Sequence, residues 1–99
     1  MDYREVSGDR EFLLSLSYGA DWREEIERFA TEQDVTAAWF VGWGAVEDAE
    51  LTFYDQDDFE TETVAFEEPL EVTTCVGSVA LGDDGEPVAD SHVTLSRPS

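Results

Sequence analysis

The ten-residue segment Ala37–Val46 constrains the fold of this chain more than any other part of its sequence. It reads Ala-Ala-Trp-Phe-Val-Gly-Trp-Gly-Ala-Val, so a strand formed by it would carry apolar side chains on both faces. Strands with two apolar faces are typical of the interior of a fold, where both faces are covered. We therefore expect a central strand here, bent at its glycines.

Other segments alternate between apolar and polar residues, which predicts strands with one buried face. With the central strand they make six: Phe12–Tyr18, Ala37–Val46, Glu50–Asp55, Thr61–Phe66, Leu70–Leu81 and Val88–Ser96. Leu51 and Phe53 fall on one face of the third of these strands. The apolar phase changes near Gly77, which predicts a β-bulge at this glycine. The turn sequence Gly82–Gly85 predicts that the last two strands form a hairpin.

One helix is expected, from Asp21 to Gln33. Asp21 is a favourable N-cap, and Glu24 three residues later completes a capping-box pattern. The apolar residues that recur at helical spacing form one face: Trp22, Ile26, Phe29 and Ala30. We therefore predict one α+β domain over residues 1–99, with a mostly antiparallel sheet of about six strands packed around one main helix.

The net charge of the chain bears on which kinds of partner it can bind. It has 25 acidic residues, five arginines, one histidine and no lysine, for a formal net charge of −20. Affinity for nucleic acid comes mainly from Lys and Arg side chains that neutralise phosphates, so direct DNA binding is not expected. An excess of carboxylates without lysine is typical of a halophilic protein with an acidic surface. The alternative is an acidic interaction module from an ordinary cell.

The sequence carries no feature of a membrane or secreted protein. Its longest apolar stretch, Ala37–Val41, is far shorter than the roughly 20 residues of a spanning helix. The first residues lack the basic start and apolar run of a signal peptide, and Cys75 is the single cysteine. We expect a cytoplasmic protein in which Cys75 is a buried, unreactive thiol.

Asp90 and His92 are the residues with the clearest chemical potential. Residues two apart on a strand project from the same face about 7 Å apart, so this carboxylate and imidazole could share a divalent metal such as zinc. A third ligand would come from Glu71, from another strand or from a neighbouring subunit. The alternative is a surface histidine beside acidic residues. No activated nucleophile accompanies it, so catalysis is not expected.

The order of these motifs resembles that of the PPC domain, the plants and prokaryotes conserved domain. The resemblance covers about residues 12–96. It rests on the helix and on segments similar to the family's "GxGAV", "a-x-L-x-y-y-D", "F-E-I" and "H-x-H-v-x-L" motifs: Asp21–Gln33, Val41–Val46, Ala49–Asp55, Pro69–Val72 and Asp90–Ser96.

This resemblance implies an antiparallel sheet around the helix and assembly as a homotrimer. Family members are described as DNA-binding, and plant members act in transcription through AT-hooks and through partner contacts of the PPC domain. His92 matches the second histidine of the "H-x-H" pair and Glu71 the glutamate of "F-E-I", whereas Asp90 replaces the first histidine. The sequence ends before the family's later "G-G-H" segment, so an open sheet edge is expected to favour pairing of subunits.

Two functional hypotheses follow. The first is a PPC-type homo-oligomeric interaction module, which binds copies of itself and a protein partner and has an indirect role at DNA. The second is a small-ligand or metal-binding protein with a site near His92, at a subunit boundary.

Overall fold

The computed structural model describes residues 1–8 and 10–97, and within them all side chains except those of residues 53–55. One helix is followed by five strands: α1 (Trp22–Glu32), β1 (Ala37–Val46), β2 (Ala49–Asp55), β3 (Glu60–Phe66), β4 (Leu70–Leu81) and β5 (Pro87–Ser96). The α+β class is confirmed. None of the described helices is long and apolar enough to cross a membrane.

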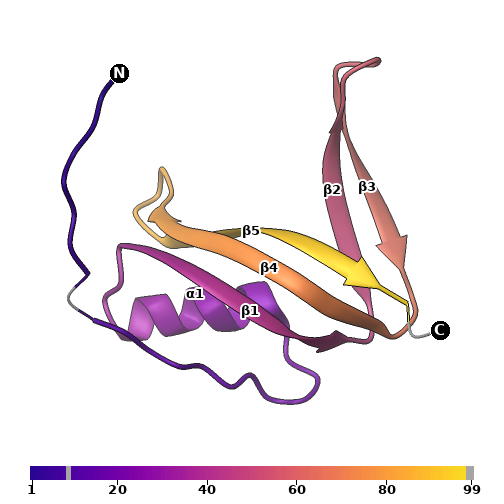
Figure 1. Ribbon diagram of the computed structural model, residues 1–99, viewed down its shortest axis with the longest axis horizontal. Helices are drawn as coiled ribbons and strands as arrows, with labels where there is room; N and C mark the ends of the chain where they lie inside the picture. The colour runs from indigo at the N-terminus through magenta and orange to yellow at the C-terminus, as the bar shows by residue number, and fades with distance from the viewer. Residues whose placement is uncertain (9, 98–99) are drawn as a thin grey trace.

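All the strand pairs are antiparallel and belong to two sheets. One sheet has the order β1-β4-β5, and the other is the β2–β3 hairpin. Helix α1 lies against one face of the three-stranded sheet, and the hairpin stands away from the sheet as a separate arm (Figure 1). The strand that we expected to be central, β1, lies at an edge of its sheet, and β4 occupies the middle.

Helix α1 begins as the sequence predicts. The side chain of Asp21 accepts a hydrogen bond of 3.0 Å from the backbone N–H of Glu24, which satisfies one of the unpaired donors at the start of the helix. The core lies between the helix and the sheet. Its buried residues are Ala30, Leu70, Val72, Cys75, Val79 and Ala89. Ile26, Val35 and Phe40 are partly buried and pack against Ala30, Val79 and Ala89.

The predicted strand over Phe12–Tyr18 is not a strand in the structure. The ring of Phe12 packs edge-on against that of Phe29 in α1, with centroids 4.9 Å apart. The segment therefore lies along the helix. Phe12 (47%), Leu14 (38%) and Tyr18 (92%) remain exposed, so the alternation of apolar residues in this segment does not correspond to a buried strand face. The described part of the chain accordingly has five strands, one fewer than expected.

The bulge lies at Thr73 and not at Gly77 as predicted. Gly77 keeps its register with both neighbouring strands, whereas β4 has one extra residue, Thr73, between Val72 and Thr74. Leu70 and Val72 are buried before the bulge, and Cys75 and Val79 after it. The prediction placed the phase change too late because it counted Val76 as inward, and this side chain is exposed.

A glycine is required at position 77 because the ring of Phe40 lies too close to leave room for a side chain. A Cβ atom on this residue would lie 2.3 Å from Cζ of Phe40 and 2.6 Å from the carbonyl oxygen of Asp90. The aromatic ring therefore packs directly on the backbone of the middle strand. This contact holds Phe40 in the core beneath the sheet.

We predict that Gly77→Ala destabilises the domain by about 1–3 kcal/mol, because overpacking displaces the Phe40 ring or the β5 backbone. Chemical unfolding at fixed KCl concentration measures the change. Ser78→Ala is the control, because this neighbouring residue is exposed, and its effect should stay below about 0.5 kcal/mol. Equal stability of Gly77→Ala and the wild type would contradict the packing described here.

Candidate functional site

One face of the three-stranded sheet is turned away from α1, and we call it the open face. The residues of β1 alternate across the sheet, so Phe40 points into the core and its neighbours point outward. Gly42 and Gly44 face the helix, since a Cβ on either would lie within 3.7 Å of the Trp22 ring. The apolar side chains of the open face are Trp39 (77% exposed), Val41 (59%), Trp43 (76%) and Val76 (47%).

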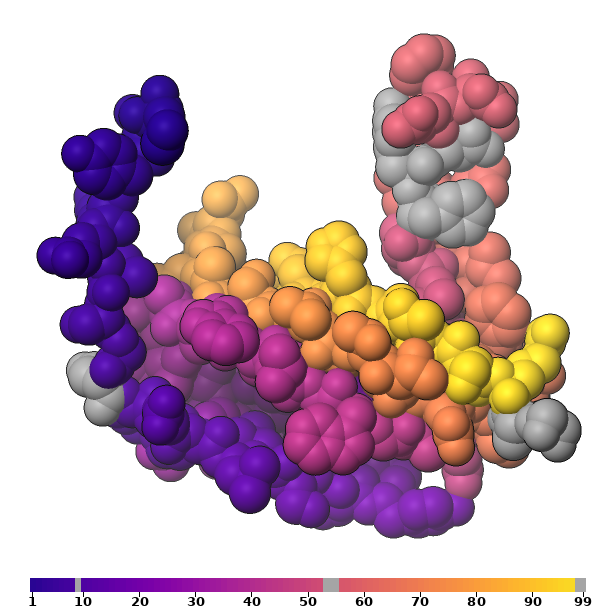
Figure 2. Space-filling model, in the orientation of Figure 1, coloured from indigo at the N-terminus to yellow at the C-terminus, as the bar shows by residue number. Residues whose placement is uncertain are grey.

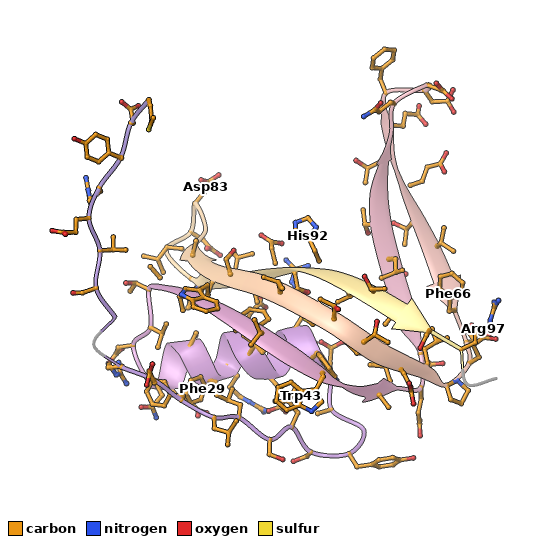
Figure 3. The ribbon with its side chains drawn as sticks, in the orientation of Figure 1. Phe29, Trp43, Phe66, Asp83, His92 and Arg97 are labelled. Atoms are coloured by element: carbon orange, nitrogen blue, oxygen red, sulfur yellow. The ribbon has the colours of Figure 1, made fainter. Side chains whose placement is uncertain are left out.

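The strand register connects these apolar residues with the predicted site residues. Val41 pairs with Val76, which pairs with His92 on β5. Directly paired residues share a face, so His92 belongs to the open face and lies beside its apolar stripe. Figure 3 shows the His92 side chain pointing away from α1. In the next row, Ser78 lies between Trp39 and Asp90.

The structure brings Asp90 and His92 together and leaves Glu71 apart. Glu71 pairs with Ser96, four residues along β5 from His92, which is roughly 13 Å at the rise of a strand. Across residues 1–8 and 10–97 no three metal-ligating side chains cluster. Arg23 lies 3.8 Å from Asp90 and competes for its carboxylate. Because zinc takes three or four protein ligands, the donors of one described chain do not fit it alone.

Helix α1 also covers part of the outer edge of β5. The N–H of Ala89 donates a hydrogen bond of 2.9 Å to Oε2 of Glu27, and Nε of Arg23 lies 3.2 Å from the same oxygen. The carboxylate therefore occupies a donor that an added strand would need. Within the described chain, β1 has no strand on its own outer edge.

The β2–β3 hairpin, which we call the arm, has one apolar and one polar face. Its register pairs Ala49 with Phe66 and Leu51 with Val64, so these four share a face. Residues of the opposite face are Glu50, Thr52, Thr63 and Ala65. The Phe53 side chain, expected on the face of Leu51, lies outside the described residues. The two strands of the arm pack mainly against each other.

Most of the arginines are engaged by acceptors of the chain itself. Arg10 donates to the carbonyl oxygen of Gln33 at 2.7 Å. Three others pair with carboxylates: Arg23 with Glu27, Arg28 with Glu25 and Arg97 with Glu68. The hydrogen bond and charge of Glu25 raise the pKa of Arg28 above its ordinary value. These ion pairs remove basic side chains from the set that could contact a phosphate.

The loop before α1 is tied to the turn between β1 and β2. The hydroxyl of Tyr18 donates a hydrogen bond to the carboxylate of Glu47. This bond, followed by the negative charge and by burial, raises the pKa of Tyr18 above its ordinary value of 10.0. The contact is exposed, so we regard it as a positioning contact of the loop.

Sequence reasoning named Asp90 and His92 as candidate site residues but did not identify the open face as a candidate surface. The signal was present in β1, where Trp39, Val41 and Trp43 alternate with Phe40 and Gly42. An apolar pattern on both faces was interpreted as a strand covered on both sides by its own chain. The structure shows a cover on one side, and the buried thiol of Cys75 lies on that covered side.

Comparisons with known proteins give consistent results. The model of the Plants and Prokaryotes Conserved (PCC) domain matches residues 3–99. A metal-containing protein from Archaeoglobus fulgidus, solved by crystallography, is 35% identical with a TM-score of 0.90, over 99% of this chain and 69% of that one. No curated protein was found to match the sequence.

Two further crystal structures share the fold at lower identity. A plant- and prokaryote-conserved (PPC) protein from Pyrococcus horikoshii is 22% identical with a TM-score of 0.77, over 83% of this chain and 57% of that one. A protein from Ralstonia eutropha JMP134 named "putative DNA-binding protein" is 24% identical with a TM-score of 0.64, over 75% of this chain and 50% of that one. This chain thus matches only half to two thirds of the length of such structures.

Proposed function

This chain belongs to the Plants and Prokaryotes Conserved domain family, and from that premise we propose that it acts as a homo-oligomeric interaction module whose role at DNA is indirect. The observation that carries the proposal is the open face. A sheet face with two tryptophan side chains about three quarters exposed is a contiguous apolar surface, and such surfaces on small domains mark interaction sites.

The total surface of the chain supports an oligomer. The described chain exposes 8,460 Å², whereas a folded monomer of 11.1 kDa exposes about 5,700 Å². Its radius of gyration is 15.3 Å, against about 13 Å for a compact domain of this length. The arm, the open face and the extended residues 1–8 contribute to the excess. This area is available to other copies of the chain.

We predict a homo-oligomer, most simply a trimer, with a mass above the 11.1 kDa of one chain. Each copy carries −20, so repulsion between copies weakens the assembly at 0.1 M KCl, where the screening length is about 10 Å, and less at 1 M, where it is about 3 Å. Light scattering after gel filtration measures both effects. A monomer at every KCl and protein concentration would contradict the proposal.

We also propose that the acidic surface is an adaptation to molar salt.

The arginine contacts support an indirect role at DNA. Four of the five arginines are engaged by Gln33 or by acidic side chains. The remaining surface is strongly negative, and a DNA backbone repels such a surface. A DNA-associated function of this chain therefore requires a basic partner protein, which the open face or another surface would recruit.

We predict that the isolated domain does not bind duplex DNA. Fluorescence anisotropy of a labelled duplex is followed at 1 M KCl and at each lower KCl concentration at which circular dichroism shows a folded protein. The expected result is a flat titration at every salt concentration. A basic DNA-binding protein is the positive control at low salt, and saturable binding by this domain would refute the indirect role.

A second candidate function is divalent metal binding at His92. It is favoured by the likeness to the metal-containing Archaeoglobus fulgidus protein and by the shared position of His92 and Asp90 on one side of β5. The ligand set of one chain is incomplete, so another copy would have to supply further donors. His92 lies on the open face, where a second copy would approach.

If the metal site exists, the purified oligomer carries zinc or another divalent ion in a fixed ratio to the chain. Elemental analysis measures this ratio, and His92→Ala should remove the ion because the variant lacks the imidazole ligand. Glu71→Ala distinguishes the predicted ligands from one another. It should leave the ion bound, because Glu71 lies roughly 13 Å from His92 along the sheet. Wild-type protein without a stoichiometric metal would eliminate this second function.

A further inference from the structure

We propose that the β2–β3 arm of one copy packs its apolar face on the open face of a second copy. This inference rests on the proposed homo-oligomeric function and specifies the two surfaces that meet. One surface is the arm face of Ala49, Leu51, Val64 and Phe66. The other is the open face, defined above by two tryptophans and two valines of β1 and β4.

The arm requires a partner for its stability. An isolated two-stranded hairpin is marginally stable in water and needs a third strand or a packing surface. The arm pairs internally over seven residues a strand, and its contacts with the other described elements are few. Its Val64 side chain is 38% exposed in the middle of the apolar face. A surface outside the described residues of this copy would therefore complete the arm.

The open face requires a cover of the same kind. Antiparallel sheets with two apolar faces pack against a second sheet about 10 Å away. The strands of the arm have seven residues and β1 has ten, so their lengths are about 23 and 33 Å at 3.3 Å per residue. The arm is thus short enough to lie within the length of the open face.

The arm of the same copy does not cover this face. Figure 2 shows the arm projecting from one end of the molecule, with a wide hollow between it and the N-terminal segment. The arm and the open face are therefore two different surfaces of each copy. On the arm face Val64 is exposed, whereas Ala49, Leu51 and Phe66 are partly buried. A contact between different surfaces is head-to-tail, and repetition of it closes a ring when the rotation between copies allows.

The exposed area matches this arrangement. The described chain exposes about 2,800 Å² more than a compact monomer of its mass. A standard interface buries about 800 Å² on each partner. A ring member uses two interfaces, one through its arm and one through its open face, which together require about 1,600 Å². The excess exceeds this requirement, although the extended residues 1–8 account for part of it.

The first experiment places a charge on each surface. Val64→Glu alters the arm, and Val41→Glu alters the open face; both residues are exposed in one copy, so the fold of the domain is retained. Each variant alone is expected to raise the dissociation constant of the assembly at least tenfold at 1 M KCl. Thr63→Glu is the matched control, because it lies next to Val64 on the polar face of the arm, and its assembly should be unchanged.

Mixing the two charged variants tests the head-to-tail geometry directly. The Val41→Glu copy keeps an intact arm and the Val64→Glu copy keeps an intact open face, so one good contact remains between them. Light scattering should show a one-to-one heterodimer in the mixture and monomers of each variant alone. A symmetric contact of like surfaces would give no such rescue, and this outcome would overturn the proposal.

Cross-linking provides a test that does not depend on weakening the assembly. Val64→Cys and Val76→Cys copies are mixed and oxidised, while the native Cys75 is buried. A disulfide between the two variants supports the contact, and Thr63→Cys should not form it. An oligomeric wild type with neither the disulfide nor the charge effect refutes the arm contact alone. A monomeric wild type refutes the proposed function as well.

Discussion

The two apolar faces of β1 are the constraint on which the rest of the structure depends. On one face, Phe40 packs on the backbone of Gly77 and the Trp22 ring lies under the glycines of the strand. These contacts hold α1 against the sheet and form the small core. On the other face, Trp39 and Trp43 are covered by no part of the described chain. The same sequence that forms the core therefore creates a surface that favours association.

The electrostatics of the chain act against contact with nucleic acid and between copies. Most arginines are bound by acceptors within the chain, so the surface is left with its carboxylates. The proposed apolar contact between copies would have to overcome this repulsion, which salt reduces. The proposed module, which associates with protein and reaches DNA through a partner, would be compatible with the negative surface.

The positions of the elements followed closely from the sequence, because local signals determine them. The cap at Asp21 and the period of the apolar residues located α1, and alternation located the strands from β1 to β5 within a residue or so at either end. The errors arose where a pattern has two physical solutions. Phe12 contacts a helix instead of a sheet and stays 47% exposed, and the bulge lies at Thr73, since Val76 points outward. Of the site residues, Asp90 and His92 share a face as their spacing required, whereas the position of Glu71 depended on pairing across strands.

The sequence by itself determined the class of the domain, its element boundaries, its acidic surface and the common face of Asp90 and His92. These features depend on backbone period, capping and charge, which act over a few residues. Only the tertiary structure decided that β1 lies at a sheet edge, that its tryptophan face is open and that the arm stands apart. An apolar pattern indicates that one face of a strand is to be buried. It does not indicate which surface buries that face, because this surface comes from distant segments or from another copy.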